Sequence, residues 1–328
     1  MKDLTVIVVS TNEADWLRPC LTSVYEHAGD IDLEVVVVNN MSTDGTEELV
    51  RDEFPQARML LCENRGFAYA NNRALMATEA RYTLLLNPDT ELLEGTLADL
   101  VAALDARLDI GVAGVRQLTV DGDVYPTMRR FPNALRALGE ALGSEHFPFK
   151  ASWLGERVLD IERYDEEFTG DWTVGSCIMF RREALESAGL LDERFFMYAE
   201  EVDVCLRVKK AGWAVHHLPV LTIRHSFDRS RYEPLREAQR AYACRHYAAK
   251  NFSPVHAGLY LGAVALRYSL RSMVPGNGRL RPERRKGSRI GVAALLGLRP
   301  PPYREEPPQA VAPWSEAPDP ESVDRSPG

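Results

Sequence analysis

Apolar and polar residues follow two different periods along the first ninety residues of the chain. Short β-branched runs predict strands, and the segments between them carry apolar residues at helical spacing. The predicted strands are residues 4–10, 33–38, 58–62 and 82–86. The predicted helices are residues 15–27, 46–54 and 66–78. This alternation predicts parallel strands joined by right-handed crossovers, and therefore an α/β fold with a mostly parallel central sheet flanked by helices.

The pattern continues beyond residue 90 with less regularity. Residues 121–170 are rich in Pro, Gly and aromatics and predict no ordered series of elements. Further helices are expected at residues 94–105, 183–189 and 200–211. Further strands are expected at residues 111–117, 174–181, 214–218 and 221–225. We therefore assign residues 1–234 to one α/β domain.

Two consecutive helices are expected after this domain. Residues 235–250 predict a basic helix with interleaved aromatics, and residues 254–274 predict a more apolar helix that contains His256, Arg267 and Arg271. A spanning helix needs about 20 mostly apolar residues, and charges at its centre are costly. An amphipathic helix that lies in a membrane interface is therefore the favoured interpretation.

The net charge of the 328 residues is −9, but the charges are unevenly distributed. Residues 235–299 hold 13 Lys or Arg and 2 Asp or Glu, a balance of +11, whereas the remaining residues hold 26 and 46, a balance of −20. A basic run at 279–286 and a short apolar segment at 290–298 suit an anionic lipid surface. Nucleic acid or phospholipid would suit this charge, and a solvated charged helix is the alternative. Residues 300–328, dominated by Pro and acids, predict a disordered tail.

The cysteines favour a reducing compartment. They show no C-x-x-C spacing, and the chain shows no secretory signal, which argues against a disulfide framework or a structural zinc site. These five residues are Cys20, Cys62, Cys177, Cys205 and Cys244.

A single carboxylate follows the apolar run at residues 82–86. Pro88 cannot donate to a strand ladder, so the strand is expected to end there and to place Asp89 at the carboxyl edge of the sheet. Ligands of open α/β sheets bind at that edge, where a carboxylate can hold a divalent cation that bridges phosphates. The alternative is a turn that Asp89 caps.

Seven short motifs, in order, carry a resemblance to a known family. They are VIVVSTN at residues 6–12, VNNMSTDG at 38–45, NRGFAYANN at 64–72, NPD at 87–89, GSC at 175–177, EEVDVCLR at 200–207, and His225. Over about residues 4–250 the chain resembles the GT-A inverting glycosyltransferases of family 2, and within them the bacterial rhamnosyltransferase-like group. The resemblance implies a Rossmann-like sheet, with a nucleotide-sugar half at about 1–117 and an acceptor half at about 118–234.

The resemblance also implies a donor site at the ends of the first strands. Asn and Asp oxygens can accept from the N3–H of uracil or thymine, and the helix start at Gly66 favours a diphosphate. Asn39 departs from the family, which often has Asp there, and Ser42 and Asp44 have the alternative role of capping the next helix. No G-x-G-x-x-G follows the first strand, which argues against an oxidoreductase. The implied donor-binding residues are Ser10, Asn12, Asn40, Asp44, Arg65 and Gly66.

A metal site is implied by Asn87-Pro88-Asp89, which takes the place of the family's D-x-D motif. Asp89 and His225 are the expected ligands of Mg²⁺ or Mn²⁺. Arg224 and Arg229 are expected to steady the departing diphosphate. The alternative for His225 is a structural histidine.

The catalytic base implied by the resemblance is Glu201, at a position that is usually Asp in the family's E-D-x-D motif. A carboxylate there takes the proton of the attacking hydroxyl, and repulsion from Glu200 is expected to raise one pKa. The alternative is that both acids only complement a helix dipole. Asp203 is expected to orient Arg207. The residues expected to contact acceptor or sugar are Trp172, Gly175, Ser176 and Glu200.

We therefore expect an inverting, metal-dependent hexosyltransferase of cell-envelope glycan synthesis. Its donor is expected to be dTDP-rhamnose, and its acceptor a glycan or a polyprenyl-linked saccharide, with no nucleic-acid partner. The expected location is the cytoplasmic face of the plasma membrane, peripherally bound through residues 235–299. The alternatives are a sugar-nucleotide nucleotidyltransferase and a non-catalytic relative that binds glycan or nucleic acid.

Overall fold

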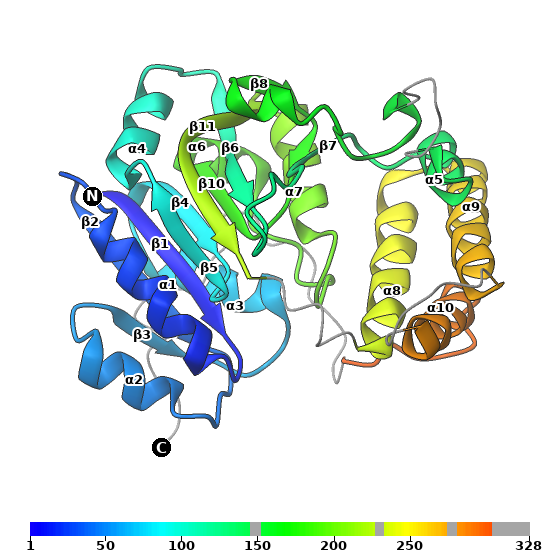
Figure 1. Ribbon diagram of the computed structural model, residues 1–328, viewed down its shortest axis with the longest axis horizontal. Coiled ribbons are helices and arrows are strands. Elements are labelled where there is room, and N and C mark those ends of the chain that lie inside the picture. The colour runs from blue at the N-terminus through cyan, green and yellow to red at the C-terminus, as the bar shows by residue number, and fades with distance from the viewer. Residues whose placement is uncertain (145–151, 227–232, 274–280, 304–328) are drawn as a thin grey trace.

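The computed structural model describes residues 1–144, 152–226, 233–273 and 281–303. Its centre is a nine-stranded sheet flanked by helices, which runs β3-β2-β1-β4-β10-β6-β11-β5, with β8 paired to β11 (Figure 1). In that order the strands are β3 (Arg58–Leu61), β2 (Leu33–Asn39), β1 (Lys2–Ser10), β4 (Ala80–Leu86), β10 (Cys177–Arg181), β6 (Ile110–Leu118), β11 (Ala214–His225) and β5 (Thr90–Glu94), and β8 is Phe168–Gly170.

The first four strands confirm the predicted parallel arrangement. Strand β1 pairs in parallel with β2 and β4, in a register that sets Ser10 opposite Asn39 and Val8 opposite Leu86. Apolar clusters cover both faces of the sheet, so these strands are buried on both sides. The carboxyl ends of β1, β2 and β4 therefore lie side by side. The crossover helices are α1 (Ala14–Glu26), α2 (Thr46–Glu53) and α3 (Phe67–Ala77).

The second half of the sheet departs from this rhythm. Strand β10 lies antiparallel between β4 and β6, and β5 lies antiparallel to β11. Strand β5 was not predicted, and the helix expected from residue 94 begins three residues later as α4 (Leu97–Asp105), where Thr96 and Asp99 form a capping box. The two strands expected at 214–218 and 221–225 are one strand, β11, whose register shifts between Leu218 and Thr222.

Two further helices confirm the pattern, and the segment without a predicted order contains small elements. Helices α6 (Arg182–Ala188) and α7 (Glu200–Lys210) lie close to the expected positions. Strands β7 (Met128–Arg129) and β9 (Trp172–Thr173) form a separate two-stranded sheet, so the strand expected from residue 174 begins only at Cys177. The remaining elements are α5 (Ala134–Ala141), η2 (Ser152–Leu154) and η3 (Glu162–Asp165).

Three C-terminal helices pack together with α5 at one end of the molecule (Figure 1). They are α8 (Pro234–Asn251), α9 (Pro254–Met273) and α10 (Arg281–Leu295). Tyr260, Tyr268 and Leu295 are buried among them, so part of the segment expected to touch a membrane at 290–298 packs inside the protein. Within the described residues no helix is both long and apolar enough to cross a membrane. Of the tail expected at 300–328, residues 304–328 lie outside the described residues.

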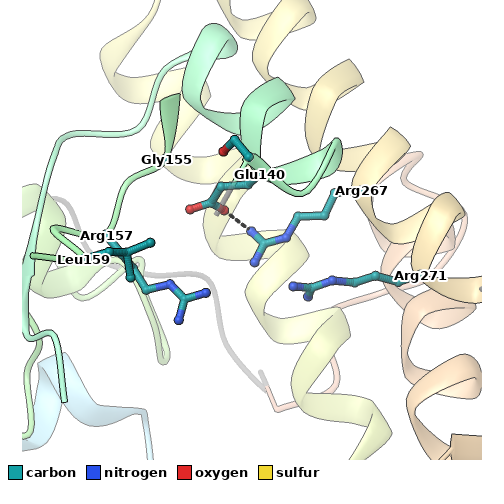
Figure 2. A pocket seen from close by; sticks show the side chains of 7 residues that line it. Glu140, Gly155, Arg157, Leu159, Arg267 and Arg271 are labelled. Atoms are coloured by element: carbon teal, nitrogen blue, oxygen red, sulfur yellow. Dashed lines mark hydrogen bonds and ion pairs between the residues drawn. The ribbon is translucent and has the colours of Figure 1, made fainter. Parts of the chain in front are cut away.

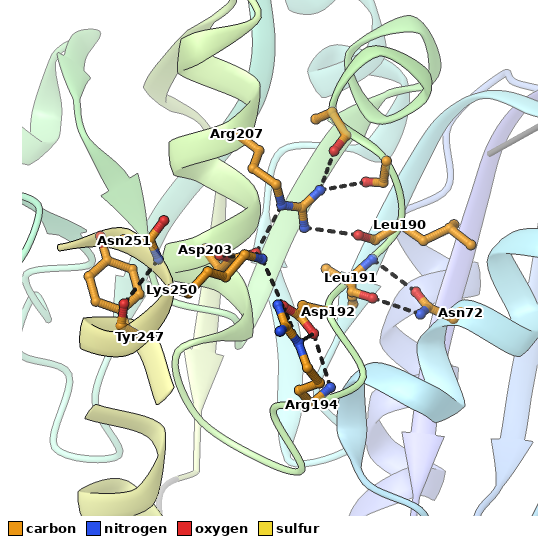
Figure 3. Close-up of polar contacts among 12 residues, drawn as sticks. Asn72, Leu190, Leu191, Asp192, Arg194, Asp203, Arg207, Tyr247, Lys250 and Asn251 are labelled. Carbon is orange, nitrogen blue, oxygen red and sulfur yellow. Dashed lines mark hydrogen bonds and ion pairs between the residues drawn. The ribbon is translucent and has the colours of Figure 1, made fainter. Parts of the chain in front are cut away.

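A buried ion-pair network fixes α8 to the α/β domain (Figure 3). Lys250 Nζ lies 2.7 Å from Asp192 Oδ2 and 2.8 Å from Asp203 Oδ2, and both aspartates are fully buried. Arg207 Nε donates to Asp203 at 2.9 Å, as predicted for this i, i+4 pair. Burial acts to raise the pKa of Asp192, but hydrogen bonds from Arg194 and Lys250 hold it well below its usual range.

Candidate active site

The loops after β1 and β2 are tied together by short polar side chains. Asn12, at a φ of +56°, accepts from the Thr43 N–H at 2.7 Å. Asp44 accepts from the Ala14 N–H at 2.8 Å and from the Thr46 hydroxyl at 2.6 Å. Partial burial acts to raise the pKa of Asp44, but these hydrogen bonds lower it overall. Asp44 therefore fastens the starts of α1 and α2, in accord with the alternative role expected for it.

Asn40 joins the same edge to the loop after β3. Its Nδ2 donates to Thr11 Oγ1 and to Asn64 Oδ1, both at 3.1 Å, and the residue is buried. Ser10 is fully buried beside it, and its Oγ has no hydrogen-bond partner within the described residues. Ser10, Asn12, Asn40 and Asp44 thus lie together at the ends of β1 and β2, as the strand order predicted.

Gly66 precedes α3 and lies against the segment that leads into α7. Its φ is +107°, and a Cβ at this position would lie 2.4 Å from the carbonyl oxygen of Phe196. The Phe67 N–H donates to the same oxygen at 2.7 Å. The close approach that this glycine permits is therefore made by the protein's own backbone. The guanidinium of the preceding Arg65 lies 4.7 Å from the ring centre of Tyr69.

Asp89 and His225 meet at the carboxyl end of β4. His225 Nε2 lies 3.0 Å from Asp89 Oδ1, because β11 pairs with β5 in a register that sets His225 opposite Thr90. The other ring nitrogen lies 3.2 Å from Gln117 Nε2, and Ser176 Oγ donates to Gln117 Oε1 at 2.7 Å. Gln117, at the end of β6, was not predicted as a site residue, because a glutamine inside a strand gives no local signal.

The chemistry of this donor pair suits a divalent cation. A carboxylate oxygen and an imidazole nitrogen that lie 3.0 Å apart are close enough that both could bind one Mg²⁺ or Mn²⁺ ion. Exchange of the Gln117 amide oxygen and nitrogen lets the same network fix either tautomer of His225, including the one in which Nε2 carries no proton and could act as a metal ligand. No group of three His, Cys, Asp or Glu that would hold a metal by itself occurs in the described part of the chain.

Glu200 and Glu201 begin α7 after two residues in the left-handed region. Tyr198 has a φ of +74° and Ala199 a φ of +69°, which is strained backbone for residues with a Cβ. Burial raises the pKa of both glutamates, and the charge of Glu201 further raises that of Glu200. One oxygen of each, Oε2, is buried and accepts no hydrogen bond from any described residue.

Of the residues expected to contact acceptor or sugar, Gly175 lies beside Glu201, and Trp172 and Ser176 make contacts of their own. A Cβ on Gly175 would lie 3.8 Å from the Cβ of Glu201 and 4.0 Å from its Cδ, so the glycine lies directly beside this side chain. Trp172 is buried, and its Nε1 donates to the Arg130 carbonyl at 3.1 Å. Ser176, also buried, instead holds Gln117 and thereby belongs to the His225 network.

Of the two arginines expected at the diphosphate, the structure describes only Arg224. Arg224 Nη2 lies 2.7 Å from Glu91 Oε2, so the structure pairs this guanidinium with a carboxylate of β5. Arg229 lies outside the described residues.

Comparison with known proteins identifies the family. A family profile described as "Glycosyl transferase family 2" matches residues 5–189, more than half of the chain. The N-acetylglucosaminyl-diphospho-decaprenol L-rhamnosyltransferase of Mycobacterium tuberculosis is 30% identical over 237 residues, which cover 68% of this chain and 75% of that protein. The rhamnosyltransferase WbbL of Escherichia coli is 20% identical over 234 residues, covering 67% and 82%.

Solved structures with a similar fold are also glycosyltransferases. The mannosyltransferase PcManGT from Pyrobaculum calidifontis, in complex with GDP-Man and Mn²⁺, matches with a TM-score of 0.55 at 20% identity, covering 90% of this chain and 86% of that one. GalNAc-T7 with UDP, GalNAc and Mn²⁺ matches with a TM-score of 0.54 at 13% identity, covering 88% and 54%. The predicted GT-A fold is thus confirmed, and the chain belongs to glycosyltransferase family 2 and is a glycosyltransferase.

Proposed function

We propose that this enzyme transfers an L-rhamnosyl group from dTDP-rhamnose, with inversion, to a hydroxyl of a lipid-linked saccharide. The observation that carries the proposal is the pair Glu200 and Glu201, each with a buried Oε2 that accepts no hydrogen bond from the described residues. A buried carboxylate with spare acceptor capacity costs stability unless a substrate hydroxyl completes it. The sugar and the acceptor are suggested by the relative from Mycobacterium tuberculosis, whose name includes both.

Glu201 acts as the general base in this proposal. The acceptor oxygen forms a bond to the anomeric carbon while the bond from that carbon to the diphosphate breaks, and Glu201 takes the hydroxyl proton. Its raised pKa makes it a better proton acceptor than an exposed glutamate. Gly175 lies beside the Glu201 side chain, and the hydroxyl would approach past it.

The donor lies along the carboxyl edge of the sheet in this proposal. Ser10, Asn12, Asn40 and Asp44 shape the loops that bind the base and ribose, with Arg65 and Gly66 next to the diphosphate. Asp89 and His225 would hold Mg²⁺ or Mn²⁺, with Arg224 and Arg229 close to the departing group. A bound divalent cation supplies charge neutralisation of the nucleoside diphosphate. The Mn²⁺ named for two proteins of similar fold supports a metal of this kind.

In this proposal the chain has a donor half at 1–117, an acceptor half at 118–234 and a membrane-binding region at 235–299. Their balance of +11 would attract the cytoplasmic leaflet at roughly 1 kcal/mol per basic residue near the surface. Replacement of Arg284, Arg285 and Lys286 by Gln in the full chain should reduce flotation with vesicles that contain phosphatidylglycerol. Unchanged flotation would rule out this mode of membrane contact.

Reconstitution tests the reaction directly. Purified enzyme, dTDP-rhamnose, Mn²⁺ and a short-chain prenyl-diphospho-N-acetylglucosamine should yield a product heavier by one rhamnosyl residue in mass spectrometry. UDP-glucose, UDP-galactose and GDP-mannose serve as matched donors. Transfer from only one of these donors would show that the enzyme uses that sugar and not rhamnose. No transfer from any donor would support the non-catalytic alternative.

A further inference from the structure

Two buried polar residues, Gln117 and Ser176, lie behind the pair formed by Asp89 and His225. Gln117 Nε2 lies 3.2 Å from His225 Nδ1, and Ser176 Oγ donates to Gln117 Oε1 at 2.7 Å. The other ring nitrogen, Nε2, lies 3.0 Å from Asp89 Oδ1. A continuous series of contacts therefore joins the Ser176 hydroxyl, through the Gln117 amide and the imidazole ring, to the carboxylate proposed to bind a metal.

Four neighbouring strands hold this network in place. Strands β4, β10, β6 and β11 lie side by side in the sheet (Figure 1). The pairing of β6 with β11 brings Gln117 next to the end of β11, where His225 lies. The Ser176 carbonyl accepts from the Asn87 N–H at 2.9 Å and so joins the start of β10 to the loop that carries Asp89. The backbone therefore fixes these residues, whereas the Gln117 amide can exchange its oxygen and nitrogen by rotation about one side-chain bond.

The contacts at Nε2 assign the ring proton in this arrangement. Asn87 Nδ2 lies 3.4 Å from Nε2, farther away than Asp89 Oδ1 at 3.0 Å. An ionised carboxylate only accepts hydrogen bonds, so the shorter contact places the proton of a neutral His225 ring on Nε2. Nδ1 then accepts from the Gln117 amide nitrogen, in accord with the orientation of that amide.

A histidine that binds a metal through Nε2 needs the opposite tautomer. Nε2 then carries no proton, and Nδ1–H requires an acceptor. After exchange of its oxygen and nitrogen, the Gln117 amide offers Oε1 to Nδ1–H, and its nitrogen donates to Ser176 Oγ. A serine hydroxyl suits both arrangements, because it donates in the first and accepts in the second. Every group of the network therefore keeps a hydrogen-bond partner in either state.

We propose that Gln117 is a positioning residue for the metal site, and that its amide turns over when His225 binds Mg²⁺ or Mn²⁺. Ser176 is its partner in both orientations. Gln117 contacts neither metal nor donor in this role and acts through the imidazole ring. The inference rests on the proposed function, since it concerns the metal site of that reaction.

The first test is the affinity for Mn²⁺ in the presence of dTDP, measured by electron paramagnetic resonance of the free ion. Gln117→Met keeps the length of the side chain but loses both amide contacts, and it should bind Mn²⁺ about tenfold more weakly than wild type. Gln117→Glu should retain most of the affinity, because a carboxylate still accepts from Nδ1–H. The matched control is Gln239→Met, at a buried glutamine of α8, which should bind as wild type does.

The second test observes the tautomer itself. Nitrogen-15 NMR of protein labelled at histidine distinguishes Nδ1–H from Nε2–H, and the signal that is lost in His225→Gln assigns the resonance. At pH 8 with chelator, wild type should carry the proton on Nε2. With dTDP and Cd²⁺, a diamagnetic ion that binds imidazole, the proton should be on Nδ1, and Gln117→Met should need more Cd²⁺ for the same change.

The results that overturn the proposal are distinct from a failure of the proposed function. Equal Mn²⁺ binding by wild type and Gln117→Met, or a His225 tautomer that is the same with chelator and with Cd²⁺, would overturn the role of Gln117. The tautomer is measured on wild type, so this test holds even where a variant does not fold. Absence of Mn²⁺ binding by wild type would instead overturn the proposed metal site itself.

Discussion

The donor edge of the sheet and a hollow between α5 and α9, lined by Arg157, Arg267 and Arg271 (Figure 2), are assembled in different ways. At the donor edge, Ser10 ends β1, Asn40 follows β2 and Asp89 comes after β4, and the parallel register brings these strand ends together. At the hollow, Arg157 and Arg271 come from segments more than a hundred residues apart along the chain and meet only because α9 packs on α5. The order of the strands in the sheet therefore assembles the donor edge, whereas the packing of helices and side chains assembles the hollow.

This difference predicts how the two regions respond to substitution. Changes at the donor edge and at the start of α7 should alter catalysis with little effect on stability, because the sheet positions these residues through its backbone. Changes in the helical cluster should alter stability, because ion pairs such as Lys250 with Asp192 and Asp203 hold it in place.

The largest expected effect is on turnover. Glu201→Gln removes the proton acceptor and should lower kcat by about 10³-fold, the usual range for a general base. Donor affinity and the melting temperature should stay near wild type. In the wild type, kcat should fall with decreasing pH at a pKa above the usual value for glutamate, since burial raises that pKa. Full activity of Glu201→Gln would assign the base to another residue; Glu200→Gln is the matched comparison.

The next largest effect should be on stability. Lys250→Met leaves Asp192 and Asp203 buried without their shared cation, and removal of one partner of a buried ion pair typically costs several kcal/mol. Because Lys250 is partly exposed, we expect the free energy of unfolding in urea to fall by roughly 3 kcal/mol. Lys210→Met, at an exposed position on α7, is the control and should change it by less than about 0.5 kcal/mol. Equal effects of the two variants would show that Lys250 does not stabilise the protein through Asp192 and Asp203.

A smaller effect is expected from Glu156, whose N–H donates to Glu140 Oε1 beside the hollow. Burial and the charge of Glu140 raise the pKa of Glu156 to about 7. The unfolded chain therefore loses this proton at lower pH than the folded protein, so the folded protein becomes less stable as the pH rises from the unfolded pKa to about 7.

The variant Glu156→Gln should lack this pH dependence. Between pH 5 and pH 8 its free energy of unfolding should therefore fall less than that of the wild type, by on the order of 2 kcal/mol. The measurement is urea unfolding at both pH values, with Glu162→Gln, an exposed position, as the control. If both variants lose stability with pH as the wild type does, Glu156 is not the group that titrates.

The sequence predicted the donor edge more fully than the acceptor side for a physical reason. Asp89 and Glu201 stand directly after a strand or at a helix start, so local pattern and motif placed them. Gln117 could not be predicted, because it reaches His225 only through the pairing of β6 with β11. Lys250 ends a segment whose basic composition gives no sign of an internal ion pair, and its contact with Asp192 and Asp203 depends on how α8 packs.

The hollow shows the same limit. Arg267 and Arg271 were noted as charges that argue against a spanning helix, but their convergence with Arg157 depends on how a segment without a predicted order folds. The apolar residues at 290–298 were expected at a membrane, yet Leu295 is buried and Leu298 is exposed. Periodicity predicts that a helix has an apolar face, but it does not say which neighbour covers that face.

The most direct test of the account is calorimetric titration of dTDP-rhamnose into wild type and Asp89→Asn, each with Mn²⁺ and with chelator. We predict binding by the wild type that needs Mn²⁺, and at least tenfold weaker binding by Asp89→Asn, whose backbone carbonyl can still accept from Ser226 and keep the loop in place. Equal binding with chelator, or equal binding by the two proteins, would contradict the assignment of the donor edge to a metal-bound nucleotide sugar.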